Sequence, residues 1–148
     1  MSSEDELVLF RRAPDRLPRR ALQQFARLLV DQVAAGRPFR CLITDDRELR
    51  RLNRRFLARD YPTDVLSFPS ERPRRFLGEL AISVQSATAQ AVQYGHSPLE
   101  EIEVLMLHGV LHLAGLDHET DRGRMARVEA RLRRKLGLPA GLIELERS

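Results

Sequence analysis

Four short segments have the hydrophobic patterns of β-strands. They cover residues 6–10, 39–44, 65–68 and 77–84, either as brief apolar runs or as alternation of apolar and polar positions. In the last segment Leu80 and Ile82 alternate with small or polar residues. Glu79 is therefore expected on the opposite face, where it either lines a pocket or meets solvent.

Five other segments have apolar residues at helical spacing, near residues 18–36, 45–61, 86–94, 97–113 and 121–136. The fourth begins with Ser97-Pro98-Leu99-Glu100, the pattern of a capping box with proline in the first turn. From Ile102 to Leu113 it is apolar on nearly every side, so this helix is predicted to run through the core. Together these patterns predict an α+β fold: a sheet of about four strands packed against several helices.

Length and composition favour one domain over residues 1–148, with no repeat, linker or low-complexity tract. No apolar run is long enough to span a bilayer, and the acidic start lacks the apolar stretch of a secretory signal. The single cysteine, Cys41, sits among apolar strand residues and is predicted to be a small buried hydrophobe. A chain with one cysteine suits a reducing compartment, so a cytoplasmic location is expected.

The charged residues are dominated by arginine. Lys+Arg is 25 and Asp+Glu is 21, which gives a net charge of +4, and Lys135 is the only lysine. Five arginines lie on the polar face of the helix predicted near 45–61, which is either a solvated face or an RNA-binding surface: Arg47, Arg50, Arg51, Arg54 and Arg55. With no tryptophan and 5% aromatic residues, binding through stacked single-stranded bases is not favoured.

Three of the four histidines fall between residues 108 and 118. His108 and His112 are four residues apart on a predicted helix, so their imidazoles share one face and can converge on one ion. Gly115 can end the helix and turn the chain, which lets His118 fold back towards the other two. Three histidine ligands leave a fourth position open, which is typical of a catalytic zinc site. We therefore predict one Zn²⁺ per chain on this buried helix.

Two further residues beside this segment have open roles. Asp117 either accepts a hydrogen bond from a ligand imidazole or caps the following segment. His96, the fourth histidine, stands alone between Gly95 and Ser97 and is interpreted as a surface or loop residue.

The histidine run shares the skeleton of the H-E-x-x-H-x-x-G-x-x-H motif of one metalloprotease class. Gly109 stands where those enzymes have the glutamate that serves as general base. Zinc lowers the pKa of a bound water without such a base, so hydrolysis of a phosphodiester stays feasible. The substitution favours a polyanionic substrate over a peptide.

Three blocks of sequence resemble the YbeY family of bacterial ribosomal-RNA maturation endoribonucleases. The first is the run from His108 to His118, the second combines Leu52-Asn53, Phe56 and Asp60 with 62–69, and the third is Leu77-Gly78-Glu79-Leu80. Their order and separation also fit, so the resemblance covers most of residues 40–135.

The resemblance implies a single-strand-specific, metal-dependent endoribonuclease of the cytoplasm. It implies a role in ribosomal-RNA maturation, notably at the 3′ end of the small-subunit RNA, and in ribosome quality control. It assigns His108, His112 and His118 as the zinc ligands. The family usually has arginine directly after the aromatic residue of its L-N-x-x-[FY] motif, where this chain has Leu57. Arg55 or Arg59 is a candidate to supply that charge.

Thr63 and Asp64 lie between a helix end and a strand, where side chains often face a cleft. Asp64 either binds a ligand there or closes a turn. With Arg55 and Arg59 they are the candidate RNA-binding residues.

The resulting hypothesis is a hydrolase in which a zinc-activated water attacks an RNA phosphodiester, with RNA and the ribosomal subunit or its assembly factors as partners. Two alternatives stay open. One is a zinc peptidase or amidohydrolase that uses a distant carboxylate as base, and the other is a non-catalytic, ribosome-associated RNA-binding factor.

Overall fold

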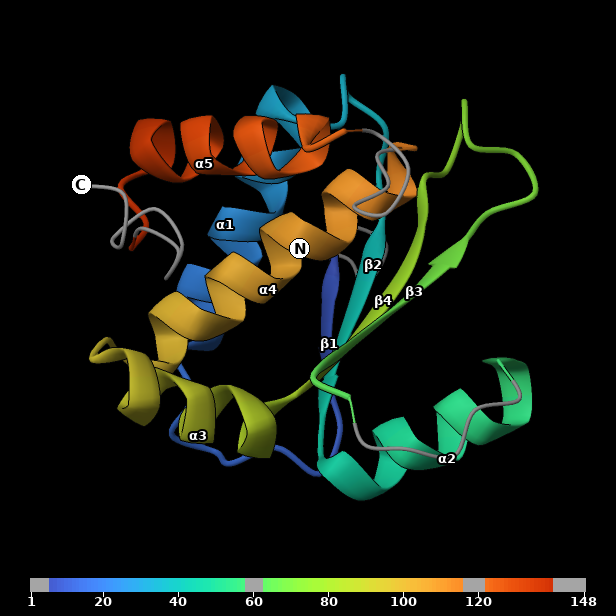
Figure 1. Ribbon diagram of the computed structural model, residues 1–148. Coiled ribbons are helices and arrows are strands. Elements are labelled where there is room, and N and C mark those ends of the chain that lie inside the picture. The colour runs from blue at the N-terminus through green and yellow to red at the C-terminus, as the bar shows by residue number, and fades with distance from the viewer. Residues whose placement is uncertain (1–5, 58–62, 116–121, 140–148) are drawn as a thin grey trace.

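A computed structural model describes residues 6–57, 63–115 and 122–139, and in these ranges it has four strands and five helices (Figure 1). The strands form one sheet in the order β1-β2-β4-β3. The first three in this order pair in parallel, and β3 pairs antiparallel with β4 at the sheet edge. Their bounds are β1 (Val8–Phe10), β2 (Arg40–Thr44), β3 (Val65–Pro69) and β4 (Gly78–Ser83). The predicted strands are confirmed, with β1 and β4 shorter than the pattern suggests.

The five predicted helices are also confirmed. They are α1 (Arg19–Gln32), α2 (Asp46–Leu57), α3 (Val84–Tyr94), α4 (Pro98–Leu113) and α5 (Arg124–Leu136). α3 begins two residues earlier than predicted because the hydroxyl of Ser83 accepts a hydrogen bond from the Ser86 amide and caps the helix there. α5 begins after Gly123, which has left-handed backbone angles. The start predicted for it, Asp121, lies outside the described residues.

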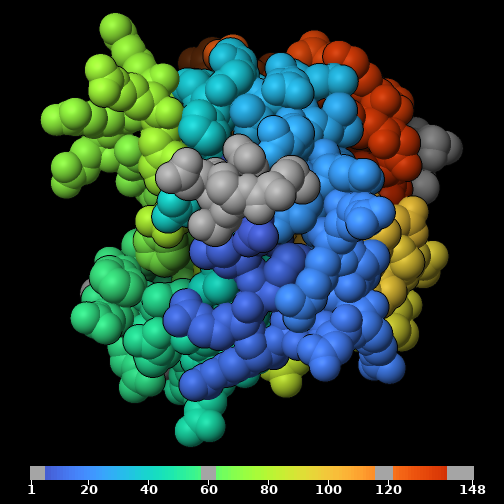
Figure 2. Space-filling model, turned by 180° about the vertical axis from the view of Figure 1, so that it is seen from behind, coloured from blue at the N-terminus to red at the C-terminus, as the bar shows by residue number. Residues whose placement is uncertain are grey.

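The helices divide unequally between the two faces of the sheet. Figure 1 shows α1, α3, α4 and α5 on one side and α2 on the other. The main core lies on the four-helix side, and Ile102, Met106, Leu107 and Val110 of α4 are fully buried in it. The prediction that this helix runs through the core is confirmed. Beneath α2 a smaller cluster forms around Leu49, Leu66 and Ala81. In the space-filling view, α2 (green) and the β3–β4 hairpin (yellow-green) project from the same side of the molecule (Figure 2).

Local interactions fix the start of α4. The Glu100 amide donates to the Ser97 hydroxyl at 3.1 Å, and the Ser97 amide donates to the Glu100 carboxylate at 3.0 Å. The predicted capping box is therefore present, and the hydrogen bond from the Ser97 backbone lowers the pKa of Glu100.

Cys41 is fully buried in β2, and burial raises the pKa of its thiol, as expected for a small core residue. None of the helices in the described ranges combines the length and apolar composition needed to cross a bilayer.

Candidate metal centre

Two of the three predicted ligands lie side by side on the C-terminal half of α4. The ring centroids of His108 and His112 are 4.8 Å apart, and the ring planes meet at 72°. Both side chains are half-buried, at the edge of the main core. The spacing of four residues thus places two imidazoles on one face of the helix, as predicted. His118, the third predicted ligand, and Asp117 lie outside the described residues.

A carboxylate from α5 fixes one of these rings. Nδ1 of His108 donates a hydrogen bond to Oε1 of Glu129 at 2.6 Å, and the Glu129 side chain is 13% exposed. The other carboxylate oxygen, Oε2, accepts a hydrogen bond from Nη2 of Arg133 at 3.3 Å. Histidines that bind metals usually donate their second ring N–H to a carboxylate or carbonyl in this way. His108 therefore fits a metal ligand, and Nε2 is the nitrogen that would bind the ion.

Sequence reasoning did not find Glu129. It is separated from His108 by 21 positions, and no local pattern joins the two. One signal was present, because Glu129 is the only acidic residue in the otherwise basic segment from Arg124 to Leu136. A single carboxylate in such a segment is expected to have a cationic or hydrogen-bonding partner.

The third ligand stays a prediction. Within the part of the chain that the structure describes, no three His, Cys, Asp or Glu side chains gather as a metal site. The described residues supply two imidazoles and the carboxylate that orients one of them. Imidazole is a common ligand of zinc and other late transition metals, so this donor set fits the predicted ion.

Gly109 stands where the metalloprotease motif has glutamate, and the packing around it explains the absence of a side chain. A Cβ atom at this position would lie 2.6 Å from Cδ2 and 3.0 Å from Cδ1 of Leu80. Leu80 is 2% exposed on β4, directly beneath the helix. Leu80 would therefore have to shift to admit even the first carbon of a glutamate side chain between the two histidines.

The candidate RNA-binding residues lie apart from the histidine pair. Thr63 donates from its hydroxyl to the Val65 carbonyl, and Asp64 accepts from the Gln90 side chain at 2.9 Å. The Asp64 carbonyl also accepts from the Ser83 amide, which places it at the C-terminal end of β4. The last turn of α4 packs against the opposite end of β4, at Gly78.

The arginine face of α2 is exposed, as predicted, but α2 lies across the sheet from α4. The guanidinium carbon of Arg55 lies 5.3 Å from the ring centroid of Phe56. Arg59 lies outside the described residues. A basic surface also exists on the side of the histidines, because α5, which carries Glu129, has exposed cations: Arg124, Arg127, Arg131, Arg134 and Lys135.

His96 was interpreted as a surface or loop residue; the loop position is confirmed, but exposure at the surface is not. It lies in the turn before α4, but its side chain is only 11% exposed, and its Nε2 contacts Oε1 of Glu101 at 2.6 Å. Glu101 is 4% exposed, and burial raises the pKa of its carboxyl group, while the bond to His96 lowers it in part. The pair satisfies two polar groups at the edge of the core, which the sequence pattern around His96 did not reveal.

Comparison with known proteins places this fold and histidine pair in a family. A family model described as endoribonuclease YbeY matches residues 11–137, which contain His108, His112 and Glu129. The chain belongs to the YbeY family. A YbeY relative from Solibacter usitatus, named endoribonuclease YbeY, is 62% identical over 143 residues, which are 97% of this chain and 96% of that protein.

Other similar proteins are more distant. A protein of the same name from Koribacter versatilis is 53% identical over 103 residues, covering 70% of this chain and 67% of that protein. The solution structure of TM1509 from Thermotoga maritima superposes with a TM-score of 0.56 at 20% identity, over 88% of this chain and 91% of that one. At this identity the structural match supports the fold alone.

Proposed function

We propose that this chain is a zinc-dependent endoribonuclease that cuts single-stranded RNA. The observation that carries the proposal is the His108–His112 pair with Glu129 bonded to Nδ1 of His108, in a chain of the YbeY family. The proposed role is the maturation of ribosomal RNA in the cytoplasm, notably at the 3′ end of the small-subunit RNA, together with ribosome quality control. The proposed partners are the ribosomal subunit and its assembly factors.

In this proposal His108 and His112 hold the ion together with His118. When bound, Zn²⁺ supplies Lewis-acid activation of water. Glu129 keeps the His108 ring in the tautomer with its proton on Nδ1 and fixes the ring orientation. Exposed arginines on α5 attract the phosphates near the scissile bond, whereas those on α2, across the sheet from the histidines, attract more distant parts of the strand.

The packing of Gly109 favours RNA over a peptide as substrate. A peptidase of the matching motif class needs a glutamate at this position as general base. Leu80 fills the space that its side chain would need. The cationic surroundings suit a phosphodiester, which is an anion, better than a neutral peptide bond.

The proposal is tested with the zinc-loaded protein and three substrates: a labelled single-stranded RNA, the same RNA in a duplex, and casein. We expect internal cleavage of the single strand only, which stops when a chelator is added and returns with Zn²⁺. Chelator-sensitive cleavage of casein without RNA cleavage would support the peptidase. Salt-dependent RNA binding without cleavage would support the non-catalytic binding factor.

The ribosomal role needs a test in cells. We expect cells without the gene to accumulate small-subunit RNA with an extended 3′ end, and the His112→Ala variant not to restore the mature end. Normal 3′ ends in cells without the gene would contradict this part of the proposal while leaving the nuclease activity in place.

A further inference from the structure

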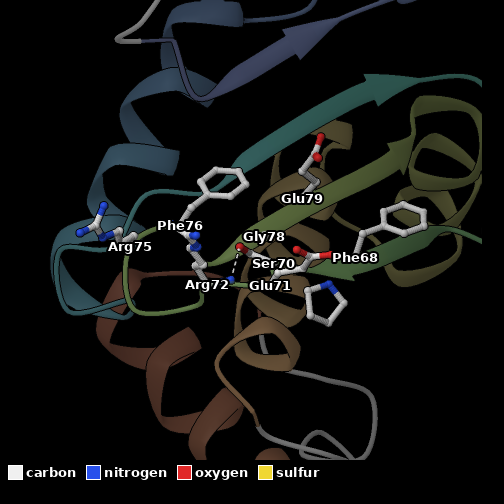
Figure 3. A pocket seen from close by; sticks show the side chains of 9 residues that line it. Phe68, Ser70, Glu71, Arg72, Arg75, Phe76, Gly78 and Glu79 are labelled. Atoms are coloured by element: carbon white, nitrogen blue, oxygen red, sulfur yellow. Dashed lines mark hydrogen bonds between the residues drawn. The ribbon is translucent and has the colours of Figure 1, made fainter.

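A cavity of about 480 Å³ opens at the β3–β4 hairpin (Figure 3). Its volume is within the range of small-molecule sites, roughly 300–1,000 Å³. It is lined by the end of β3, the connecting loop and the start of β4: Phe68, Pro69, Ser70, Glu71, Arg72, Arg75, Phe76, Gly78 and Glu79. The loop itself is ordered by a turn in which the Arg72 amide donates to the Ser70 hydroxyl at 3.0 Å.

Two aromatic rings line this cavity, one of which, Phe68, also packs against the small cluster beneath α2. Phe68 and Phe76 line it, and both are only partly buried. The Phe68 ring meets the edge of the Phe56 ring, with centroids 6.0 Å apart, and Phe56 is 58% exposed. Three of the six phenylalanines therefore lie on this one side of the molecule. Partly exposed rings in a cavity are the surfaces on which single-stranded bases stack, so the low overall aromatic content is misleading here.

The polar residues around these rings can read the edge of a base. Glu79 lines the cavity together with Phe76 and Phe68, and all three are labelled in Figure 3. A carboxylate accepts hydrogen bonds from the exocyclic amino groups of adenine, cytosine or guanine, whereas uracil offers only its ring N3–H. Arg72 and Arg75 at the rim are donors for base carbonyls or for phosphate oxygens.

The cavity lies next to the helix that carries the histidines. Gly78 lines the cavity, and a Cβ atom on it would lie 2.8 Å from Cδ2 of Leu113 and 2.5 Å from the Phe68 carbonyl oxygen. Leu113 directly follows His112 in the last turn of α4. Only glycine permits this approach, and its φ of +147° adds a second reason for glycine here. Gly78 thus lies at the edge between the two faces of the sheet, because Leu113 lies on the α4 face and Phe68 packs on the α2 face. An RNA strand bound both at the histidine pair and in the cavity would cross this edge.

We propose that the hairpin cavity binds a base of the single-stranded RNA substrate, stacked on Phe68 and Phe76 and read by Glu79, with a preference for bases that have an amino group. This inference rests on the proposed function, because it takes RNA as the ligand. The two proposals can be tested separately, because recognition of a base requires neither the metal nor cleavage of the RNA.

The experiment measures the affinity of metal-free protein for short labelled oligonucleotides of adenylate, cytidylate and uridylate, and for an abasic oligomer of the same length. We expect the wild-type protein to bind adenylate and cytidylate more tightly than uridylate, and the abasic oligomer most weakly. Phe76→Leu should weaken binding of adenylate and cytidylate about five- to tenfold and leave abasic binding unchanged. Phe10→Leu, which changes a partly buried phenylalanine on the α1 side of the sheet, is the matched control.

Glu79→Gln tests the base preference at an exposed position that the fold does not need. We expect it to reduce the ratio of adenylate to uridylate affinity while the protein still binds both. The proposal would be overturned if the wild-type protein bound abasic and base-bearing oligomers with equal affinity. It would also be overturned if Phe76→Leu weakened binding of the abasic oligomer as much as binding of adenylate and cytidylate. Base-dependent binding by a protein that fails to cut RNA when loaded with zinc would support the pocket and contradict the proposed function alone.

Discussion

Oε1 of Glu129 lies 2.6 Å from Nδ1 of His108, across the interface between α5 and α4. Arg133, one turn further along α5, donates to the other oxygen of the same carboxylate. The geometry of the candidate metal centre therefore depends on α5 as well as on the histidine-bearing helix. The first two predictions concern this centre.

Glu129→Gln should weaken Zn²⁺ binding by about 10- to 100-fold, because the variant keeps the shape of the side chain but loses the charge that holds the Nδ1 proton of His108. Competition with a chromophoric chelator measures the affinity, and thermal unfolding of the metal-free protein reports on the fold. Arg133→Met should give a smaller loss, and no further loss in the Glu129→Gln background, because Arg133 acts through the carboxylate. Unchanged zinc affinity in Glu129→Gln would contradict the positioning role.

His112→Ala should abolish stoichiometric zinc, because it removes one of the two adjacent imidazoles. Elemental analysis of the purified protein measures the metal content. His96→Gln is the control, since His96 is bonded to Glu101 and should leave the zinc content unchanged. Full zinc occupancy in His112→Ala would refute the ligand assignment.

Gly109→Ala should destabilise the protein by about 1–2 kcal/mol, although alanine is the better helix former. The added Cβ would lie 2.6 Å from a side chain of the packed core, that of Leu80. Urea unfolding measures the free energy. Shortening the neighbour in the double variant Gly109→Ala/Leu80→Val should recover part of the loss, so strictly additive losses would argue against a steric cause.

The free energy of unfolding is expected to depend on pH through the carboxyl group of Glu103. Burial raises the pKa of its carboxyl group from 4.5 to about 7, and neighbouring Glu100 contributes to the rise. The folded state therefore favours the protonated form, and its contribution to stability is complete below pH 4.5 and is lost as the pH rises to about 7.

Glu103→Gln should accordingly raise the free energy of unfolding by about 1–2 kcal/mol near pH 8, allowing for partial exposure, with little change near pH 4. Urea unfolding at the two pH values measures the difference, and Glu71→Gln at an exposed position is the control. The same stabilisation at both pH values would show that the carboxyl group does not titrate in this way.

The sequence predicted the features that depend on neighbouring residues. The capping box at Ser97 and Glu100 follows from a four-residue pattern, and the adjacency of His108 and His112 follows from helical geometry. The order of helices and strands was predictable for the same reason, because each has its own hydrophobic period.

The features that escaped prediction join distant segments. The contact between His108 and Glu129 requires knowing how α5 crosses α4, and hydrophobic spacing does not specify that crossing. The hairpin cavity depends on which phenylalanines stay partly exposed in the folded chain, and the low aromatic content predicted no such site. The sequence also did not predict that α2 lies on the far side of the sheet, because hydrophobic spacing predicts a helix but not the face of the sheet that the helix covers.

α2 is attached to the sheet by the small cluster of Leu49, Leu66 and Ala81, whereas α4 is enclosed by the main core. Detaching α2 would expose less apolar surface than detaching α4, so its amide protons should exchange with solvent through local opening at a lower free energy than those of α4. In the proposed nuclease, such a helix would shift its arginines to follow RNA strands of different paths, while the imidazoles on α4 would stay at fixed spacing. The sheet would then separate an adaptable RNA-attracting surface from a rigid metal-binding one.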